Sequence, residues 1–310
     1  MTATNAISHD IHSSISADVV VVGSINQDTT LRVARFPAEG ETALAHSVSV
    51  ALGGKGANQA VAAARAGARV ALIAAVGDDP EGVAALRHLG DHGVDTSLCL
   101  SVSGVRTGMA YILVNADGAN QITVASNANG LLVADDIASA VARVRGAGVV
   151  MTQQEIAPSV VRATLACAVA TGIRSVLNAS PALSRAAQIP APDLLVVNRH
   201  EAEQLANEAS ADAEALALAL VARGLAASAI VTDGGRGAAA SDGQISWFQE
   251  APAAEVVDTT GAGDAFTGAL GAALARGEDL ERALAHAVAA GSHAVTQHGA
   301  QHTDQPDAER

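Results

Sequence analysis

Aromatic side chains are scarce in this chain, at 2% of 310 residues, although hydrophobic residues together reach 49%. A sizeable core can therefore be buried, but it must be built from Ala, Val, Leu and Ile. The length is sufficient for one large α/β domain or two small ones. No run of about 18 apolar residues is present, so we expect no membrane span.

Positive charge is also in short supply. The formal net charge is -14, and Lys and Arg form no block anywhere in the sequence. Nucleic-acid binding needs a basic surface that displaces counterions from phosphates, so we exclude that class of partner. Any phosphate that binds must be held by local backbone amides, with or without a metal ion, rather than by a positive field.

Cysteine is limited to Cys99 and Cys167, which lie far apart and lack metal-ligand spacing. We predict that both are buried small hydrophobes in a reducing compartment rather than a disulfide pair. The first 18 residues are polar and lack the apolar stretch of a signal peptide. These features predict a cytoplasmic protein.

Strand-like and helix-like segments alternate along most of the chain. Short β-branched runs predict strands at 19–25, 70–76, 148–151, 175–177, 194–197 and 229–232. Ala-rich patterns predict helices at 57–66, 134–144, 159–170 and 211–223. This alternation predicts a three-layer α/β/α domain whose central sheet is mostly parallel and covered by helices on both faces.

Two segments, 28–50 and 106–124, instead alternate apolar and polar residues, as half-exposed antiparallel strands do. Within the second, residues 111–114 and 121–124 predict a hairpin around a loop that ends in Gly118. We predict that the two segments form one small sheet, a lid beside the main domain. The resulting organisation is a disordered tail at 1–17, one domain at 18–303 with the lid at about 26–50 and 105–125, and a second tail at 304–310.

The most informative stretch is DTTGAGDAFTG at 258–268, which follows a strand-like 255–257 and precedes a helical pattern. Gly261, Ala262 and Gly263 are therefore expected at a helix N-terminus, where small residues let backbone N–H groups and the helix dipole approach an anion. A phosphoryl group in transfer spreads negative charge over its equatorial oxygens, which suits such a pocket.

Asp264 is expected in the first turn of that helix. An acidic residue there can simply complement the helix dipole. Beside a phosphate pocket, however, a carboxylate is better explained as the base that takes a proton from an attacking hydroxyl.

Polar residues also gather where other predicted strands and helices meet. The stretch LGGKGANQ at 52–59 is not a Walker A loop, because that loop needs Gly at Ser49 and Ser or Thr at Gly56. Its Lys and Asn can bind a polyhydroxy ligand, although a plain tight turn is the alternative. Asn26 and Asp28 end the first strand, where ligands bind in parallel sheets, but both residue types also favour turns.

Two further segments, 198–201 and 232–237, each allow two interpretations. Asn198 and Glu201, three residues apart at a helix start, can hold water on a magnesium ion or simply cap the helix. The Gly-rich residues 232–237 join two strands, either as a hairpin loop or as a nucleotide contact.

Taken together, these segments resemble the ribokinase branch of the pfkB carbohydrate-kinase family, which also holds fructokinases and adenosine kinase. The likeness runs from about residue 18 to 303. DTTGAGD at 258–264 is typical of the whole family, whereas GSINQD at 23–28 and GGKGANQ at 53–59 indicate the ribokinase branch. The family has a parallel sheet with flanking helices and a β lid that also forms a dimer clasp.

The resemblance implies roles for particular residues. The sugar site would consist of Asn26, Asp28, Gly54, Lys55, Asn58 and Glu155. Asp264 would be the base, with the amides of Gly261, Ala262, Gly263 and Asp264 as the anion hole. ATP would contact Asn198, Thr232, Gly234, Gly237, Gly263 and Val288, and Glu201 would reach magnesium through water. A potassium ion would bind at Asp258, Thr260, Ala294, Gln297, Gly299 and Thr303.

Three departures from the family pattern accompany the likeness. Val288 stands where the family often has Asn near the adenine, Gln297 and His302 are unfamiliar in the cation loop, and Arg199-His200 replaces commoner acidic or Thr residues. None of these positions is expected to touch the reacting atoms.

The resulting functional hypothesis is an ATP-dependent kinase that phosphorylates the 5-hydroxyl of D-ribose, with Mg²⁺ and K⁺ as cofactors, as a homodimer joined through the lid. The alternatives are a kinase of deoxyribose, fructose or adenosine, or a catalytically silent sugar-sensing protein. An oxidoreductase is disfavoured, because no G-x-G-x-x-G follows the first strand with an acidic residue about 20 positions further on.

Overall fold

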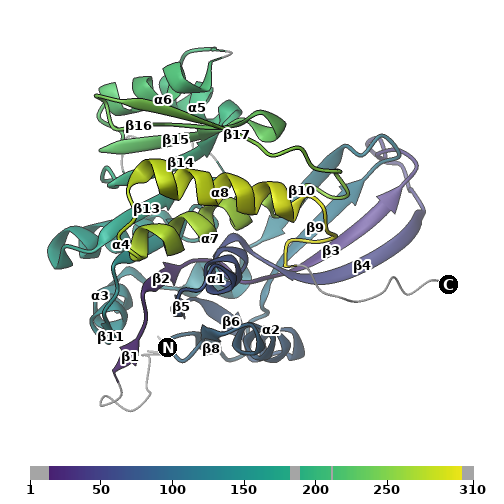
Figure 1. Ribbon diagram of the computed structural model, residues 1–310. Helices are drawn as coiled ribbons and strands as arrows, with labels where there is room; N and C mark the ends of the chain where they lie inside the picture. Colours follow the sequence, from purple (N-terminus) through teal and green to yellow (C-terminus); the bar gives the residue numbers. More distant parts are fainter. Residues whose placement is uncertain (1–13, 182–188, 211, 302–310) are drawn as a thin grey trace.

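The computed structural model describes residues 14–181, 189–210 and 212–301. Within them, nine strands form a central sheet in the order β17-β16-β15-β14-β13-β12-β2-β5-β7 (Figure 1). Their bounds are β2 (Val19–Val22), β5 (Val70–Ile73), β7 (Val94–Asp95), β12 (Val149–Gln153), β13 (Arg174–Asn178), β14 (Leu194–Asn198), β15 (Ser228–Thr232), β16 (Gly237–Ser241) and β17 (Ser246–Glu250). The strands from β7 to β15 are parallel, and β16 and β17 are antiparallel to their neighbours.

Helices cover both faces of this sheet. One set packs on each face, and the bounds are α1 (Lys55–Arg65), α2 (Pro80–Asp91), α3 (Ala134–Ala142), α4 (Pro158–Thr171), α5 (Arg199–Ala206), α6 (Ala213–Ala222), α7 (Ala262–Ala275) and α8 (Leu280–Ala294). Strand β2 shows why both faces are apolar: Val20 and Val22 join the core under α3 to α6, whereas Val19 and Val21 join the core under α1, α2, α7 and α8. Successive side chains of a strand point to opposite faces, so a strand buried on both sides must be apolar throughout.

The lid is a separate four-stranded sheet that projects from the main domain (Figure 1). Its strand order is β10-β9-β3-β4, with bounds β3 (Asn26–Val33), β4 (Ala45–Gly53), β9 (Gly108–Val114) and β10 (Asn120–Ala125). The hairpin predicted around Gly118 is confirmed as β9–β10, and β3 and β4 are also antiparallel. The central pair β3–β9 is parallel, unlike the antiparallel pairing expected, because both strands start at the base of the lid, where Asn26 pairs with Gly108.

Short elements complete the described fold. They are β1 (Ile15–Ser16), β6 (Ala75–Gly77), β8 (Leu100–Val102), β11 (Val144–Arg145) and the 3-10 turns Asn127–Leu131 and Gly234–Arg236. The predicted strand at 70–76 is two strands, because β6 leaves the central sheet and pairs with β8. No helix within the described ranges is long and apolar enough to cross a membrane. Both cysteines carry free thiols; Cys167 is buried, and Cys99 is partly buried.

Two further sequence-based assignments are wrong. The disordered tail was expected to reach residue 17, yet β1 pairs with β11, since Ile15 and Ala17 are apolar and bury in the core. The remainder of that tail and residues 304–310 lie outside the described residues. Residues 255–257 are not a strand: Val256 and Val257 are exposed, and the backbone N–H of Val257 donates instead to the carbonyl of Val295 at 2.8 Å.

Candidate active site

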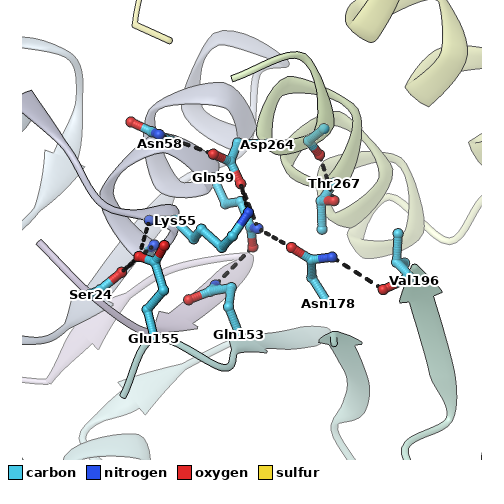
Figure 2. Close-up of polar contacts among 12 residues, drawn as sticks. Ser24, Lys55, Asn58, Gln59, Gln153, Glu155, Asn178, Val196, Asp264 and Thr267 are labelled. Carbon is cyan, nitrogen blue, oxygen red and sulfur yellow. Dashed lines mark hydrogen bonds and ion pairs between the residues drawn. The ribbon is translucent and has the colours of Figure 1, made fainter. Parts of the chain in front are cut away.

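The site lies at the carboxyl edge of the sheet, where helices α1 and α7 begin side by side (Figure 2). Their close approach depends on Gly268, because a Cβ there would lie 2.5 Å from the Cβ of Ala62 and 2.6 Å from the carbonyl oxygen of Gln59. The absence of this Cβ lets the first turn of α7 reach the first turns of α1. Ligands of parallel α/β sheets bind at this edge.

Asp264 is buried, with 6% of its surface exposed, and both of its carboxylate oxygens accept hydrogen bonds. Asn58 Nδ2 donates to Oδ2 and Gln59 Nε2 donates to Oδ1, each at 3.0 Å. Lys55 Nζ lies 4.0 Å from Oδ1. The carboxylate therefore points into the protein cleft, in one fixed orientation, rather than into solvent.

Lys55 is the only lysine in the sequence, and 26% of its side chain is exposed. Burial alone would lower the pKa of its ammonium group. The negative charges of Asp264, Glu155 and Glu201 oppose that effect and leave the pKa above its ordinary value. Lys55 is thus a permanent cation that partly neutralises a cluster of carboxylates.

Asp28, on lid strand β3, faces the same cluster. Burial, and then the charges of Glu155 and Asp264, raise the pKa of Asp28 to about 7. Its Oδ1 is buried and has no hydrogen-bond partner among the described residues. On the neighbouring strand, a Cβ at Gly53 would lie 2.0 Å from Asp28 Oδ2, so any larger residue there would displace the Asp28 carboxylate. A buried acceptor without a partner is costly, and a ligand hydroxyl would satisfy it.

Glu155 follows strand β12 and closes the cluster from below. Its Oε2 accepts from Ser24 Oγ at 2.6 Å and from the backbone N–H of Lys55 at 3.0 Å (Figure 2). Gly54 immediately precedes α1 with φ of +89°, and a Cβ there would lie 2.8 Å from the backbone nitrogen of Asn26. Both facts require glycine at this turn, which aims α1 at the cleft.

Asn26, which was also predicted to bind the sugar, lies at the margin of this cluster of carboxylates. Its Oδ1 accepts from Asn129 Nδ2 at 2.8 Å at the base of the lid. It also lines a separate cavity of about 300 Å³ between the lid base and α2, together with His88 and Gln301. The structure thus brings Asp28, Lys55, Asn58, Glu155 and Asp264 together, with Asn26 bonded at their margin.

The N-terminus of α7 offers unused backbone donors. Helix α7 begins at Ala262, after Gly261 with φ of +77°, and the N–H groups of Gly263 and Asp264 donate to no acceptor in the described part of the chain. A Cβ at Gly261 would lie 2.5 Å from both the Cα and the Cβ of Ala300, whereas at Gly263 nothing lies within 4 Å. Free N–H groups with open space before them form an anion-binding site.

A cavity of about 590 Å³ adjoins this helix N-terminus. Its walls are largely apolar, and they include the predicted nucleotide residues Thr232, Gly234, Gly237, Gly263 and Val288. Asn198, also predicted to contact the nucleotide, does not line it. Gly237 has φ of +122°, and a Cβ there would lie 1.9 Å from the carbonyl oxygen of Gln249, so this wall also requires glycine.

Asn198 and Glu201 form a reciprocal capping box at the start of α5. Asn198 Oδ1 accepts from the N–H of Glu201, and Glu201 Oε2 accepts from the N–H of Asn198, each at 2.9 Å. This is the capping reading of the pair, and it leaves the water-mediated contact to magnesium as a prediction. Beside it, the buried carboxylate of Asp233 bridges Arg199 at 3.4 Å and Arg236 at 2.5 Å, an arrangement that the sequence did not indicate.

The predicted potassium loops lie side by side. Asp258 Oδ1 accepts from the N–H of Thr260 and Oδ2 from the N–H of Gly299, each at 2.9 Å. Burial raises the pKa of Asp258, but these bonds outweigh it and hold the pKa below its usual value. Ala294 and Gln297 lie in the same turn, where the N–H of Gln297 donates to the carbonyl of Ala294 at 3.2 Å. Thr303 lies outside the described residues.

Several residues of the site were not predicted. Beneath Asp264, Gln59 Nε2 also donates to Asn178 Oδ1 at 3.0 Å, and Asn178 Nδ2 donates to the Val196 carbonyl at 3.1 Å (Figure 2). Gln153 Nε2 donates to Gln59 Oε1 at 2.8 Å. Only Gln59 could have been found, since it belongs to the motif at 53–59.

A fixed carboxylate beside free helix N–H groups, between a polar cluster and an apolar cavity, defines a phosphotransferase that acts on an alcohol. The chain belongs to the pfkB family of carbohydrate kinases, whose domain matches residues 16–308.

Individual relatives agree with this assignment. The chain is 37% identical to a ribokinase of Bacillus subtilis (strain 168) over 285 residues, 92% of this chain and 94% of that protein. It is 33% identical to a deoxyribokinase of Salmonella typhi over 289 residues, covering 92% and 94%. The solved structure of Arabidopsis thaliana ribokinase complexed with ribose and ATP superposes with a TM-score of 0.80 at 31% identity, covering 93% and 94%. The ribokinase-like α/β fold with its lid is thereby confirmed.

Proposed function

We propose that this chain is a ribokinase: it transfers the γ-phosphoryl group of ATP to the 5-hydroxyl of D-ribose. The observation that carries the proposal is Asp264, a buried carboxylate in fixed orientation beside the free N–H groups that start α7. Asp264 takes the hydroxyl proton as the sugar oxygen bonds to the γ-phosphorus, and the bond from that phosphorus to the ADP oxygen breaks. The free N–H groups of Gly263 and Asp264, with that of Gly261 nearby, stabilise the charge on the phosphoryl oxygens, whereas the N–H of Ala262 donates to the carbonyl of Thr259 at 3.3 Å.

The sugar would occupy the cluster of polar groups next to the base. Asp28 Oδ1 would accept a sugar hydroxyl, which satisfies the buried oxygen that has no partner among the described residues. Lys55, Asn58 and Glu155 would contact other hydroxyls, with Gly54 and Asn26 shaping the turn below them. Closure of the lid over the sugar would exclude water, which otherwise competes as phosphoryl acceptor.

The nucleotide would occupy the 590 Å³ cavity, with Val288 near the adenine and Thr232, Gly234 and Gly237 along one wall. Magnesium, when bound, supplies charge neutralisation at the β- and γ-phosphates. No group of three His, Cys, Asp or Glu side chains that could hold a metal occurs within the described ranges. The magnesium ion would therefore be carried by the nucleotide phosphates, and Glu201 would contact it through water. Asn198 would hold Glu201 in place.

The proposal extends to a potassium ion between the loops at 258–260 and 294–299, held by Asp258 and by oxygens of Thr260, Ala294, Gln297, Gly299 and Thr303. The charged carboxylate of Asp258, which ties these loops together, supports it. Turnover is expected to rise when potassium is added to potassium-free, sodium-free buffer. Equal rates with and without potassium would reject this part.

A homodimer joined through the lid belongs to the same proposal. Exposed apolar side chains on the lid support it, including Val48, Val50, Ile122 and Val124. A cytoplasmic location is proposed with it, because the reaction needs the ATP that cells keep there.

A coupled assay of ADP release with ribose, deoxyribose, fructose and adenosine tests the activity. We expect the highest kcat/KM with ribose. Deoxyribose is a competing substrate that is supported by the 33% identity to a deoxyribokinase. A higher kcat/KM with deoxyribose would reassign the substrate, and sugar binding without any turnover would make the chain a sugar sensor.

A further inference from the structure

A chain of hydrogen bonds runs from the base Asp264 out of the cleft to helix α2. Asn58 Nδ2 donates to Asp264 Oδ2 at 3.0 Å, and Gln301 Nε2 donates to Asn58 Oδ1 at 2.8 Å. Gln301 Oε1 lies 2.9 Å from Nε2 of His88. We call Asn58, Gln301 and His88 the outer arm. Asn58 and Gln301 are buried, so their amides have few other partners.

The direction of every bond in the outer arm follows from its inner end. An ionised carboxylate only accepts, so Asn58 must present its NH₂ to Asp264 and its carbonyl to Gln301. Gln301 must then donate with its NH₂ and accept with Oε1. His88 must therefore donate to Gln301 Oε1, which requires a proton on Nε2 of His88. Burial, followed by the charge of neighbouring His92, lowers the pKa of His88, which favours a neutral ring carrying that single N–H.

The outer arm is held at both ends. Arg65 of α1 donates to the Gln301 carbonyl, so Gln301 is fixed against the same helix that carries Asn58. The ring of His88 stacks on His92 with centroids 4.1 Å apart, and His92 Nδ1 donates to the His88 carbonyl at 2.8 Å. His88 thus has a restrained ring whose one donor faces Gln301.

We propose that His88 is a positioning residue for phosphoryl transfer, acting through Gln301 and Asn58 to fix the orientation of the Asp264 carboxylate. His88 lies outside the motifs at 23–28, 53–59 and 258–264, and its ring does not touch the reacting atoms. The inference rests on the proposed function, because it assigns His88 to the same reaction. Loss of the His88 donor frees the Gln301 amide to turn, which releases Asn58 and lets Asp264 leave the geometry that proton transfer needs.

The experiment compares four single variants and one double variant under saturating ATP and sugar. His88→Leu removes the donor while filling the space, so that water does not enter from the adjoining 300 Å³ cavity. His88→Gln places an amide N–H near the position of Nε2. Arg87→Leu, at the exposed neighbouring position on α2 and outside the outer arm, is the matched control.

We expect His88→Leu to lower kcat by about threefold to tenfold, the range for one lost hydrogen bond, with KM for ATP unchanged. His88→Gln and Arg87→Leu should stay within about twofold of the unaltered protein. Gln301→Met should lower kcat as His88→Leu does, and the double variant should be no worse than the worse single, because both changes break one arm. If His88→Leu does not fold, His88→Met replaces it.

Unchanged kcat in His88→Leu, failure of His88→Gln to restore it, or multiplied losses in the double variant would each overturn the inference alone. A purely structural role would lower the melting temperature without this pattern in kcat. Absence of turnover by the unaltered protein with every sugar tested would instead overturn the proposed function, and the inference with it.

Discussion

The sugar half and the nucleotide half of the cleft are lined by different kinds of groups. The sugar half consists of charged and amide side chains: Asp28, Glu155 and Asp264 surround the one ammonium group of Lys55. The nucleotide half, the 590 Å³ cavity, consists of backbone, glycine and small apolar side chains, with Gly237, Gly263 and Val288 as representatives. One half therefore works through charge and directed hydrogen bonds, and the other through shape and main-chain donors.

This difference has a physical basis. Sugar hydroxyls differ from one another only in position and direction, so discriminating them requires placed acceptors and donors. A triphosphate brings further negative charge to a chain whose net charge is already -14, and helix N–H groups bind it without a cationic side chain. We therefore expect the sugar half to respond to changes of charge and pH, and the nucleotide half to changes of backbone and volume.

The largest effect is expected for Asp264→Asn in the sugar half. Loss of the base should lower kcat by about 10²–10⁴-fold, while sugar binding measured by calorimetry persists. Asp91→Asn, on the exposed end of α2, is the control and should leave kcat unchanged. Near-normal turnover by Asp264→Asn would remove Asp264 as the base.

A pH-dependent effect on stability is expected from Asp28. Because its pKa is raised to about 7 in the folded protein, the folded state holds a proton that the unfolded state loses above its ordinary value of 3.8. Stability should therefore fall as pH rises from 4 toward 7 and then level off. Between pH 5 and 8 this amounts to at most about 2–3 kcal/mol.

The measurement is urea unfolding of the unaltered protein and of Asp28→Asn at pH 5 and 8. Asp28→Asn should abolish this part of the pH dependence of the free energy of unfolding. Relative to the unaltered protein, the variant should therefore be more stable at pH 8 than at pH 5. Asp117→Asn, at the exposed turn of the same lid, should keep the slope. A slope identical in all three proteins would mean that Asp28 ionises freely.

In the nucleotide half, a matched pair of glycines separates backbone strain from pocket volume. Gly261→Ala should lower the free energy of unfolding by about 1–2 kcal/mol from its left-handed backbone alone, with further cost from contact with Ala300. Gly263→Ala has room and lies in a helix, so stability should hold while KM for ATP rises. Thermal melts and ATP titrations distinguish the two, and equal stability losses would contradict the comparison.

The smallest effect is expected at Val288, which lines the nucleotide cavity. Val288→Asn adds a hydrogen-bonding group near the proposed adenine position and should lower KM for ATP by about twofold to fivefold at constant kcat. Val288→Leu, which matches Asn in shape but not in polarity, should give no such gain. A change in KM for ribose instead would show that the two halves are not separable here.

Sequence reasoning succeeded where a local pattern carries the contact. The motifs at 53–59 and 258–264 each set a helix start, and parallel strands bring such starts to one edge of the sheet, so Lys55 and Asp264 could be placed together. It failed where partners lie far apart without a shared pattern. Gln301 bonds Asn58 across 243 positions, and Asn178 bonds Gln59 across 119, with no spacing that signals either contact.

The errors in the fold have a similar cause. The alternating pattern of the lid strands fixed which residues share a face but not the direction of pairing, so the parallel β3–β9 pair was missed. Val256 and Val257 have strand-like side chains, yet they pair with no strand among the described residues, and propensity alone does not make a strand.

Because Lys55 is the only lysine, reagents that modify amines act on this protein in an unusual way. Apart from the α-amino group, every acylating agent, aldehyde or reducing sugar that attacks primary amines has one target in this chain, and that target lies in the cleft. In most proteins such damage is spread over a surface of many lysines and is largely silent. Here each side-chain adduct would fall beside Asp264, so the extent of Lys55 labelling and the fraction of disabled molecules should be the same number.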